Sequence, residues 1–237
     1  MPRKTRTVPG TPKTTPGYLV RKKIRRLLVT AGPTREMLDP VRFLSNVSTG
    51  HMGYEIARVG RALGFRVTLI SGPTALLKPK GLRFVPVVSA EDMRRAVFKS
   101  WPETDALVMT AAVCDYTPVR YSPSKIKRIR QRSIRFRRTT DILERVGRRK
   151  GNRVLVGFAL ETEAVERNAL RKLRVKNLDL IAANWYASGN NPFGDRRISM
   201  TLIARDGSKK SLARVSKKKA ARAILREVAR LLARKTC

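Results

Sequence analysis

A short run of hydroxyl and glycine residues, Ser48-Thr49-Gly50, stands directly before a segment with helical spacing of apolar residues. Hydroxyls, small residues and free backbone N–H groups at the start of a helix form a cradle for an anion, and the helix dipole strengthens the attraction. The glycine spacing matches neither the dinucleotide-binding pattern Gly-x-Gly-x-x-Gly nor the P-loop pattern Gly-x-x-x-x-Gly-Lys-Ser/Thr. The run therefore predicts an anion site of another kind.

Other small or polar residues follow further predicted strands. They are residues 31–34 and 45–50 after the first strand, 111–115 after the fourth, 159–162 after the fifth, and Asn184 after the sixth. In open α/β sheets, ligands bind beyond the carboxyl ends of the strands. We therefore expect these loops to meet at one edge of the sheet and to form the functional site there.

The elements that must position these loops alternate along the chain. Nearly continuous apolar runs, typical of strands covered on both faces of a parallel sheet, occupy residues 27–30, 67–70, 84–88, 106–109, 154–158 and 178–183. Apolar residues have helical spacing in residues 52–63. The same spacing appears in two later segments, one after the capping-box pattern of Ser89 and Asp92 and one after Thr162, a candidate helix cap. The alternation predicts the α/β class, with a Rossmann-like, doubly wound and mainly parallel sheet.

The carboxyl-terminal part has a different pattern. Residues 197–215, around Asp206-Gly207, predict a β-hairpin extension, and a terminal helix is expected from near Ser216. Two long stretches, residues 32–50 and 116–138, match neither helix nor strand. The second holds nine Lys or Arg and no acid. Loops of this length inside a compact domain are usually functional or disordered.

The chain is strongly basic, with 53 Lys and Arg against 17 Asp and Glu and a formal net charge of +36. Such a surface attracts polyanions, and a nucleic acid is one candidate partner. Residues 1–23 are predicted to be a flexible basic arm, or alternatively a segment that docks on an anionic partner, and residues 24–237 a single domain.

No apolar run is long enough to span a bilayer and no secretory signal is evident, so we expect a cytoplasmic protein. Two cysteines and one histidine argue against a disulfide framework and a structural zinc site.

Several blocks of sequence, in order from Arg26 onward, carry a more specific signal. They include Val29-Thr30-Ala31-Gly32-Pro33-Thr34-Arg35-Glu36 and Ser48-Thr49-Gly50-His51-Met52-Gly53, and also residues 39–46, 111–116, 125–127, 156–162, 172, 176–179, 184 and 193–195. Together they resemble the phosphopantothenate–cysteine ligases, which are phosphopantothenoylcysteine synthetases of the DNA/pantothenate metabolism flavoprotein C-terminal domain family. The flavoprotein decarboxylase half of fused bacterial versions does not match, so we expect the stand-alone form.

The resemblance implies a reaction of coenzyme A biosynthesis. The carboxylate of 4′-phosphopantothenate attacks the α-phosphorus of a nucleoside triphosphate, with CTP favoured over ATP, and L-cysteine then takes up the acyl group from the acyl-nucleotide. Because two polyanions must meet, the task of the protein is positioning and charge neutralisation, aided by Mg²⁺ or Mn²⁺. The family also implies a homodimer with active sites shared between subunits.

The resemblance assigns roles to matching positions but names no metal ligands. The implied catalytic residues are Asn46, whose amide would hold the acyl intermediate, and Lys125, on a flap that closes over the triphosphate. The implied nucleotide-binding residues are Ala111, Asp115, Lys125, Lys127, Phe158, Lys172 and Lys176. The implied phosphopantothenate-binding residues are Arg42, Asn46, Ser48, Thr49 and Gly50. No amino-acid nucleophile is needed, and Cys114 is predicted to be a packed, inert thiol.

Three departures from the family pattern leave alternatives open. Thr139-Thr140-Asp141 stands where Asn-Pro-Asp is common, His51 where lysine is frequent, and the flap is unusually rich in arginine. These departures are compatible with a divergent member of impaired ligase activity. A basic nucleic-acid-binding protein on the same fold is a further hypothesis, which predicts binding with a steep dependence on salt.

Overall fold

The computed structural model describes residues 25–127, 133–187, 191–194 and 196–235. The basic arm predicted for residues 1–23 lies outside the described residues, as does part of the arginine-rich flap. The proposed boundary between that arm and the domain therefore stays a prediction.

An eight-stranded sheet forms the centre of the fold, in the order β12-β11-β10-β9-β6-β1-β4-β5. Six strands are parallel: β1 (Arg26–Ala31), β4 (Arg66–Ser71), β5 (Arg83–Pro86), β6 (Ala106–Met109), β9 (Val154–Glu161) and β10 (Leu180–Trp185). The hairpin of β11 (Ile198–Ala204) and β12 (Lys209–Val215) extends the sheet in antiparallel fashion. The parallel strands follow the 3-2-1-4-5-6 order of doubly wound sheets, with the switch point between β1 and β6.

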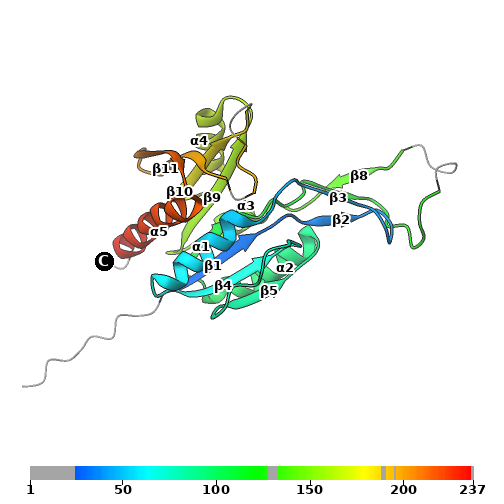
Figure 1. The fold of residues 1–237 in the computed structure, drawn as a ribbon, viewed down its shortest axis with the longest axis horizontal. Coiled ribbons are helices and arrows are strands. Elements are labelled where there is room, and N and C mark those ends of the chain that lie inside the picture. Colours follow the sequence, from blue (N-terminus) through cyan, green and yellow to red (C-terminus); the bar gives the residue numbers. More distant parts are fainter. Residues whose placement is uncertain (1–24, 128–132, 188–190, 195, 236–237) are drawn as a thin grey trace, which may run out of the picture.

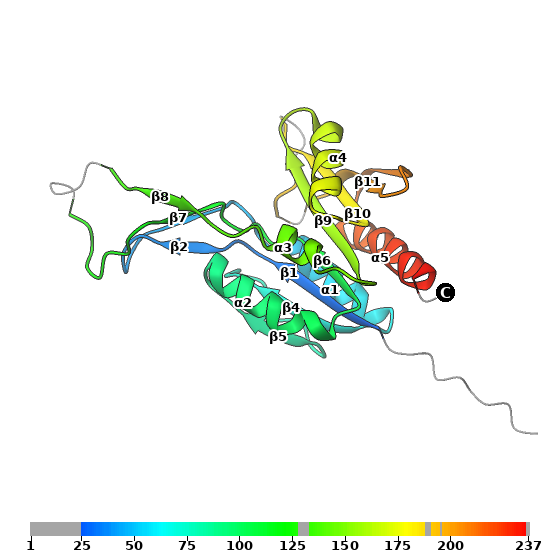
Figure 2. The same ribbon diagram turned by 180° about the vertical axis from the view of Figure 1, so that it is seen from behind.

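Helices cover both faces of the sheet (Figures 1 and 2). On one face, α1 (His51–Ala62) and α5 (Lys217–Arg234) pack in a single apolar cluster with strand residues such as Leu27 and Val29. On the other face, α2 (Ala90–Ser100), α3 (Ile142–Arg148) and α4 (Val165–Val175) pack with residues such as Leu28. Burial on both faces explains why the strands are apolar along their whole length. The predicted fold class, including the hairpin extension and the terminal helix, is confirmed.

Some of the helix caps predicted from the sequence are present in the structure and one is not. Ser89 and Asp92 form the predicted capping box of α2, and Ser216 caps α5. The predicted cap at Thr162 is wrong, because α4 begins after Ala164, a left-handed residue, without a side-chain cap. Helix α3 was not anticipated, since a seven-residue helix is too short to show a clear apolar period.

The described parts of the two long stretches form a projecting arm, distinct from the basic arm predicted for residues 1–23, at the carboxyl edge of the sheet (Figure 1). It contains the hairpins of β2 (Arg35–Met37) with β3 (Phe43–Ser45) and of β7 (Tyr116–Pro118) with β8 (Phe136–Arg138). The expectation that these stretches hold no strand is therefore wrong. Strands of three residues are too short for an alternating pattern to be recognised in sequence.

Asp39 joins the two halves of the arm. Its buried carboxylate accepts hydrogen bonds from the backbone N–H groups of Val41 (2.8 Å) and Arg42 (2.8 Å), and across the arm from Ile126 (3.2 Å). At the base of the arm, Glu36 accepts a hydrogen bond from the backbone N–H of Ala90, the first residue of α2. These contacts join the two halves of the arm and attach the arm to the core.

Candidate active site

Direct backbone contacts beyond the strands join the two sides of the switch point between β1 and β6. The N–H of Ala112 donates to the carbonyl of Gly32 (2.9 Å), and the N–H of Thr34 donates to the carbonyl of Ala112 (3.2 Å). Gly32 has φ of 70°, and an added Cβ would approach the carbonyl oxygen of Gly72 at 3.0 Å. A side chain at this position is therefore strained, which accounts for the glycine of the first motif.

A small cavity of about 260 Å³ lies at this edge, beside the start of α1. Its wall contains residues from the strand ends, from α1 and from α5, among them Ser48, Thr49, Gly50, Ala111, Phe158, Asn184 and Lys217. The N-cap of α1 is Gly50, which has no side chain, so the first backbone N–H groups of the helix are not satisfied by a capping side chain. The geometry matches the anion cradle predicted from the Ser48-Thr49-Gly50 run.

Gly53 lets α1 reach this edge. A Cβ on Gly53 would lie 2.5 Å from the Cβ of Ala31 and 3.0 Å from the carbonyl oxygen of Thr30. The helix therefore packs directly on the end of β1, with no room for a side chain between them. This close approach places the helix start beside the strand ends.

A larger cavity of about 700 Å³ shares Ala111, Ala112 and Phe158 with the small one. Its wall also includes Asp115, Thr139, Thr140, Asp141 and Lys176. The ammonium of Lys176 lies 2.7 Å from a carboxylate oxygen of Asp141. The two cavities thus form neighbouring spaces on either side of the β6 end, one beside a helix start and one with an exposed carboxylate and a lysine.

Thr139, one of the departures from the family pattern, has a structural contact. Its hydroxyl donates to the carbonyl of Cys114 (2.6 Å), and its N–H donates to the carbonyl of Asp115 (2.9 Å). The threonine therefore holds the segment after β6 against the end of β8. The departure keeps the wall of the larger cavity in place.

Asn46 lines neither cavity but contacts a residue that lines both. Its amide nitrogen donates to the carbonyl of Ala112 (3.1 Å), a residue that lines both cavities, and lies 3.8 Å from the sulfur of Cys114. An amide has two N–H donors: one is used on the carbonyl of Ala112, and the other is directed at the sulfur of Cys114, a weak acceptor that a ligand oxygen can displace. The side chain is thus held beside the wall that the two cavities share.

Cys114 is buried, as the prediction of a packed thiol requires. Burial raises the pKa of the thiol, and the nearby charges of Glu36 and Asp115 raise the pKa further, whereas a hydrogen bond with Thr34 opposes them. The protonated thiol is a poor nucleophile. The residue therefore packs the site and is not suited to covalent catalysis.

The remaining predicted site residues lie away from both cavities. Lys172 donates to a carboxylate oxygen of Glu161 (2.6 Å) on the side of α4, and it lines neither cavity. Arg42, Lys125 and Lys127 belong to the arm, where Arg42 pairs with Asp39 (3.3 Å) and donates to the carbonyl of Ile126. The structure thus brings together the predicted residues on the strand ends and separates them from those on the arm.

Lys217 is a wall residue that sequence reasoning did not select. It is 4% exposed, and its ammonium donates to the carbonyl of Pro192 (2.7 Å) beside the small cavity. In sequence it is one of three consecutive lysines, residues 217–219, with nothing to distinguish it from its neighbours. Its burial follows from the way the hairpin of β11 and β12 leads into α5.

The acidic side chains of the described residues form no group of three with His or Cys that could hold a metal ion by itself. In the same part of the chain no helix is long and apolar enough to cross a membrane. Asp115, Asp141 and Glu144 nevertheless bring carboxylates to the larger cavity. Mg²⁺ is commonly bound by one or two carboxylates together with substrate phosphates, so this donor set fits such an ion.

Comparisons with known proteins show which family and which fold the chain resembles. The model of the family described as DNA/pantothenate metabolism flavoprotein C-terminal domain matches residues 22–232. The coenzyme A biosynthesis bifunctional protein CoaBC of Bacillus subtilis is 45% identical over 209 residues, which are 87% of this chain and 52% of that protein. The chain thus spans about half the length of this curated relative.

Two solved structures show a similar fold. The crystal structure of the C-terminal domain of a CoaBC protein matches with a TM-score of 0.76 and 40% identity, covering 88% of this chain and 95% of that one. A mutant of Cab2 in complex with phosphopantothenate-cysteine matches with a TM-score of 0.73 and 16% identity, over 90% and 89% of the two chains. At that identity the second comparison shows the fold alone.

Proposed function

Because the chain belongs to the DNA/pantothenate metabolism flavoprotein C-terminal domain family, we propose that it is a phosphopantothenate–cysteine ligase of coenzyme A biosynthesis. The observation that carries the proposal is the pair of adjoining cavities at the switch point, whose walls are built by the family's motifs. Two adjoining spaces of different character suit a reaction in which two anionic substrates must be brought into contact.

The proposed reaction has two steps. The carboxylate of 4′-phosphopantothenate attacks the α-phosphorus of CTP, which forms an acyl-cytidylate and releases pyrophosphate. The amine of L-cysteine then attacks the acyl carbon, forms the amide and releases CMP, and the amine loses a proton. A carboxylate is a poor electrophile, so the nucleotide supplies the leaving group that amide formation requires.

The larger cavity is the proposed nucleotide site. Asp115, Ala111 and Phe158 provide its wall, and Lys176 provides a cation that is now paired with Asp141. Bound Mg²⁺ would neutralise charge on the triphosphate and orient it, with Asp115 and Asp141 as the carboxylates that fit this role. Lys172, paired with Glu161, lies on the same helix one turn earlier and can reach a ligand only if that ion pair opens.

The small cavity is the proposed phosphopantothenate site. The uncapped start of α1, with Ser48, Thr49 and Gly50, offers donors to the phosphate. Asn46, which contacts Ala112 in the wall shared by the two cavities, would donate an N–H to the oxygen of the acyl group in place of its long contact with the sulfur of Cys114. The helix start and Lys217 bring positive potential to this cavity.

We propose that the active protein is a homodimer in which the arm of one subunit completes the site of the other. The arm exposes several large apolar side chains, including Val41 (60% exposed), Val47 (76%) and Tyr121 (54%). Large apolar side chains exposed on one arm suit an interaction surface. Arg42, Lys125 and Lys127 lie on this arm and line neither cavity of their own chain, so a partner's cavity is the place where they would act.

A direct assay tests the ligase proposal. Purified protein is incubated with phosphopantothenate, cysteine, Mg²⁺ and either CTP or ATP, and pyrophosphate release is followed. We expect turnover with CTP exceeding that with ATP. Asn46→Ala should let the acyl-nucleotide accumulate, whereas Lys125→Gln should slow its formation.

The outcomes separate the activity from the site assignment. Absence of turnover with both nucleotides would overturn the ligase proposal. Wild-type behaviour of both variants in an active enzyme would overturn only the roles of Asn46 and Lys125.

A further inference from the structure

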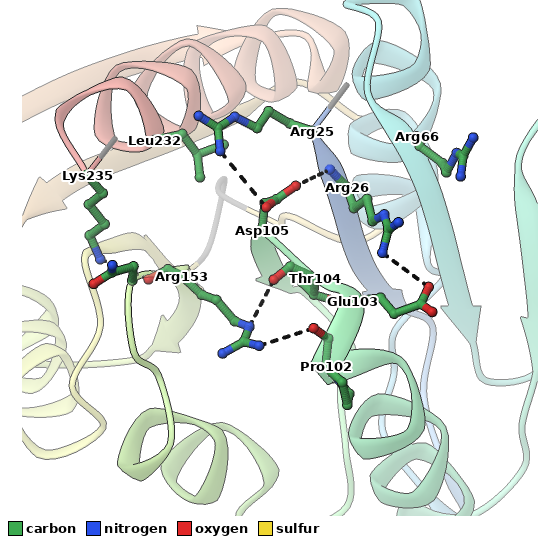
Figure 3. A pocket seen from close by; sticks show the side chains of 11 residues that line it. Arg25, Arg26, Arg66, Pro102, Glu103, Thr104, Asp105, Arg153, Leu232 and Lys235 are labelled. Carbon is green, nitrogen blue, oxygen red and sulfur yellow. Dashed lines mark hydrogen bonds and ion pairs between the residues drawn. The ribbon is translucent and has the colours of Figure 1, made fainter. Parts of the chain in front are cut away.

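A third cavity, of about 600 Å³, lies at the opposite, amino-terminal edge of the sheet (Figure 3). It is lined where β1, β4, β6 and β9 begin and where α5 ends. The proposed ligase site lies at the other end of these strands, so that site does not account for this cavity. Its lining is unusual in charge: five cationic side chains face two carboxylates.

Arg153 is a fixed cation in this wall. Its guanidinium donates to the carbonyls of Thr104 (3.0 Å) and Pro102 (3.2 Å) and lies 4.9 Å from the centre of the Trp101 ring. Carbonyls and an aromatic face hold the side chain without neutralising it, and it has no carboxylate partner among the described residues. A guanidinium held in this way keeps its charge and further N–H donors for an anion.

Arg26 and Arg66 stand side by side in this wall. They are directly paired residues of the neighbouring parallel strands β1 and β4. Like charges at paired positions of a sheet repel each other. The guanidinium of Arg26 lies 3.4 Å from the carboxylate of Glu103, which is largely exposed. Arg66 makes no ion pair within the described part of the chain. An anion between the strand starts would relieve the repulsion.

The carboxylates near the cavity are already occupied. Asp105 accepts a hydrogen bond from the backbone N–H of Arg26 (2.7 Å). Behind the wall, Asp179 is shared by the ammonium groups of Lys150 (3.0 Å) and Lys235 (2.9 Å). Asp105 also lies 4.0 Å from the guanidinium of Arg25, so the lining cations without a carboxylate partner among the described residues are Arg66 and Arg153.

We propose that this cavity is a binding site for an oligophosphate, either free or as part of a nucleotide. The recognised group is a di- or triphosphate, whose several negative charges match the excess of cations around the cavity. Arginine binds phosphate oxygens through paired N–H donors, and a volume of several hundred Å³ is typical of small-ligand sites. None of the residues that line it lines either cavity of the proposed ligase site.

Trp101 offers a local reporter, because it stacks with Arg153 in the cavity wall. The chain has two tryptophans, and Trp185→Phe leaves Trp101 as the only one. Inorganic triphosphate is titrated into this variant at low salt, and Trp101 emission is recorded. We expect a saturable change, and titrations with CTP and cytidine separate recognition of the phosphates from recognition of the nucleoside.

Two variants that each remove one positive charge from the cavity wall, and one matched control variant, test whether triphosphate binds in this cavity. In the Trp185→Phe background, Arg66→Gln and Arg153→Gln should each weaken triphosphate binding by about tenfold. Arg222→Gln, an exposed position on α5 away from the cavity, removes the same charge and should leave the affinity unchanged. Circular dichroism checks that Arg153→Gln is folded, and Arg66, which makes no ion pair among the described residues, tests the site without that risk.

Three results would overturn the proposal. One is an unchanged Trp101 emission at millimolar triphosphate. Another is an equal loss of affinity in Arg66→Gln and Arg222→Gln, which would indicate attraction to the overall charge. The third is binding that requires the nucleoside and is absent with inorganic triphosphate.

Discussion

At the scale of single residues, Asp39 is the carboxylate that holds the arm together. Burial alone would raise its pKa, but hydrogen bonds from Val41, Ile126 and Arg42 and the charge of Arg42 together lower the pKa below its ordinary value. The carboxylate therefore stays ionised at neutral pH and keeps its three backbone donors. Loss of these bonds should release the segment that carries Lys125 and Lys127.

Limited proteolysis measures that release. Trypsin cleaves after Lys125 and Lys127, and Asp39→Ala should raise the rate of cleavage there by about tenfold, because the local opening becomes easier. Asp206→Ala, which removes an exposed carboxylate of the β11–β12 hairpin, serves as the control and should leave that rate unchanged. Equal rates in Asp39→Ala and the wild type would show that another contact fixes the arm.

Glu91, in the first turn of α2, should contribute to acid stability. The hydrogen bonds of Arg94 (2.6 and 2.7 Å) lower its pKa from 4.5 to about 2, despite the opposing effect of burial, and Arg95 assists. A depressed pKa gives stability that is complete above the ordinary value and is lost as the pH falls through the folded value. Glu91→Gln should therefore lower Tm at pH 7 but not at pH 2.

The matched variant for this test is Glu163→Gln, which changes an exposed carboxylate that makes no ion pair among the described residues. Its Tm should follow that of the wild type between pH 7 and pH 2. A difference between Glu91→Gln and the wild type that persists at pH 2 would mean that the carboxylate acts through packing and not through its charge.

At the scale of elements, the contact between α1 and β1 sets the geometry of the small cavity. Gly53→Ala places a Cβ 2.5 Å from that of Ala31 and 3.0 Å from a backbone oxygen, so the helix must move away from the strand end. We expect a loss of about 1–3 kcal/mol in unfolding free energy by urea denaturation. Gly60→Ala in the same helix, which meets a Leu27 side chain that can rotate, should cost less. Similar losses in the two variants would contradict the tight packing of Gly53.

The same elements show what the sequence allows one to predict. Strands buried on both faces, such as β1 and β6, can be predicted from their apolar runs, and the order of the motifs places the loops at one edge. The projecting arm could not be predicted, because its three-residue strands are fixed by long-range hydrogen bonds such as that from the backbone N–H of Ile126 to Asp39. The cavity at the amino edge was also missed, since the pairing of Arg26 with Arg66 becomes visible only with the register of the sheet.

At the scale of the whole molecule, shared sites predict that two defective variants can repair each other. Lys125→Gln should damage the arm, and Lys176→Gln should damage the cavity that receives it. If the sites are shared, equal mixing with subunit exchange places both lesions in one site of each mixed dimer and leaves the other site intact. Statistical exchange should restore about a quarter of the wild-type activity. Activity that stays at the level of the separate variants would show that Lys125 acts within its own chain.

The net charge of +36 predicts attraction to polyanions in general. Binding of a DNA duplex, measured by fluorescence anisotropy, should be independent of sequence and should fall steeply between 50 and 200 mM salt, on the order of what counterion release gives for several phosphate contacts. Tight binding that depends on sequence and survives at higher salt would instead favour the nucleic-acid-binding hypothesis.

Helix α5 touches both edges of the sheet. Its first residue, Lys217, lies in the wall of the small cavity, and Leu232 near its end lies in the wall of the amino-edge cavity. Its eighteen residues form a rod of about 27 Å that changes little in length. A shift of α5 along its axis therefore moves both walls at once. Any ligand that displaces one end alters affinity at the other, and this influence is equal in both directions.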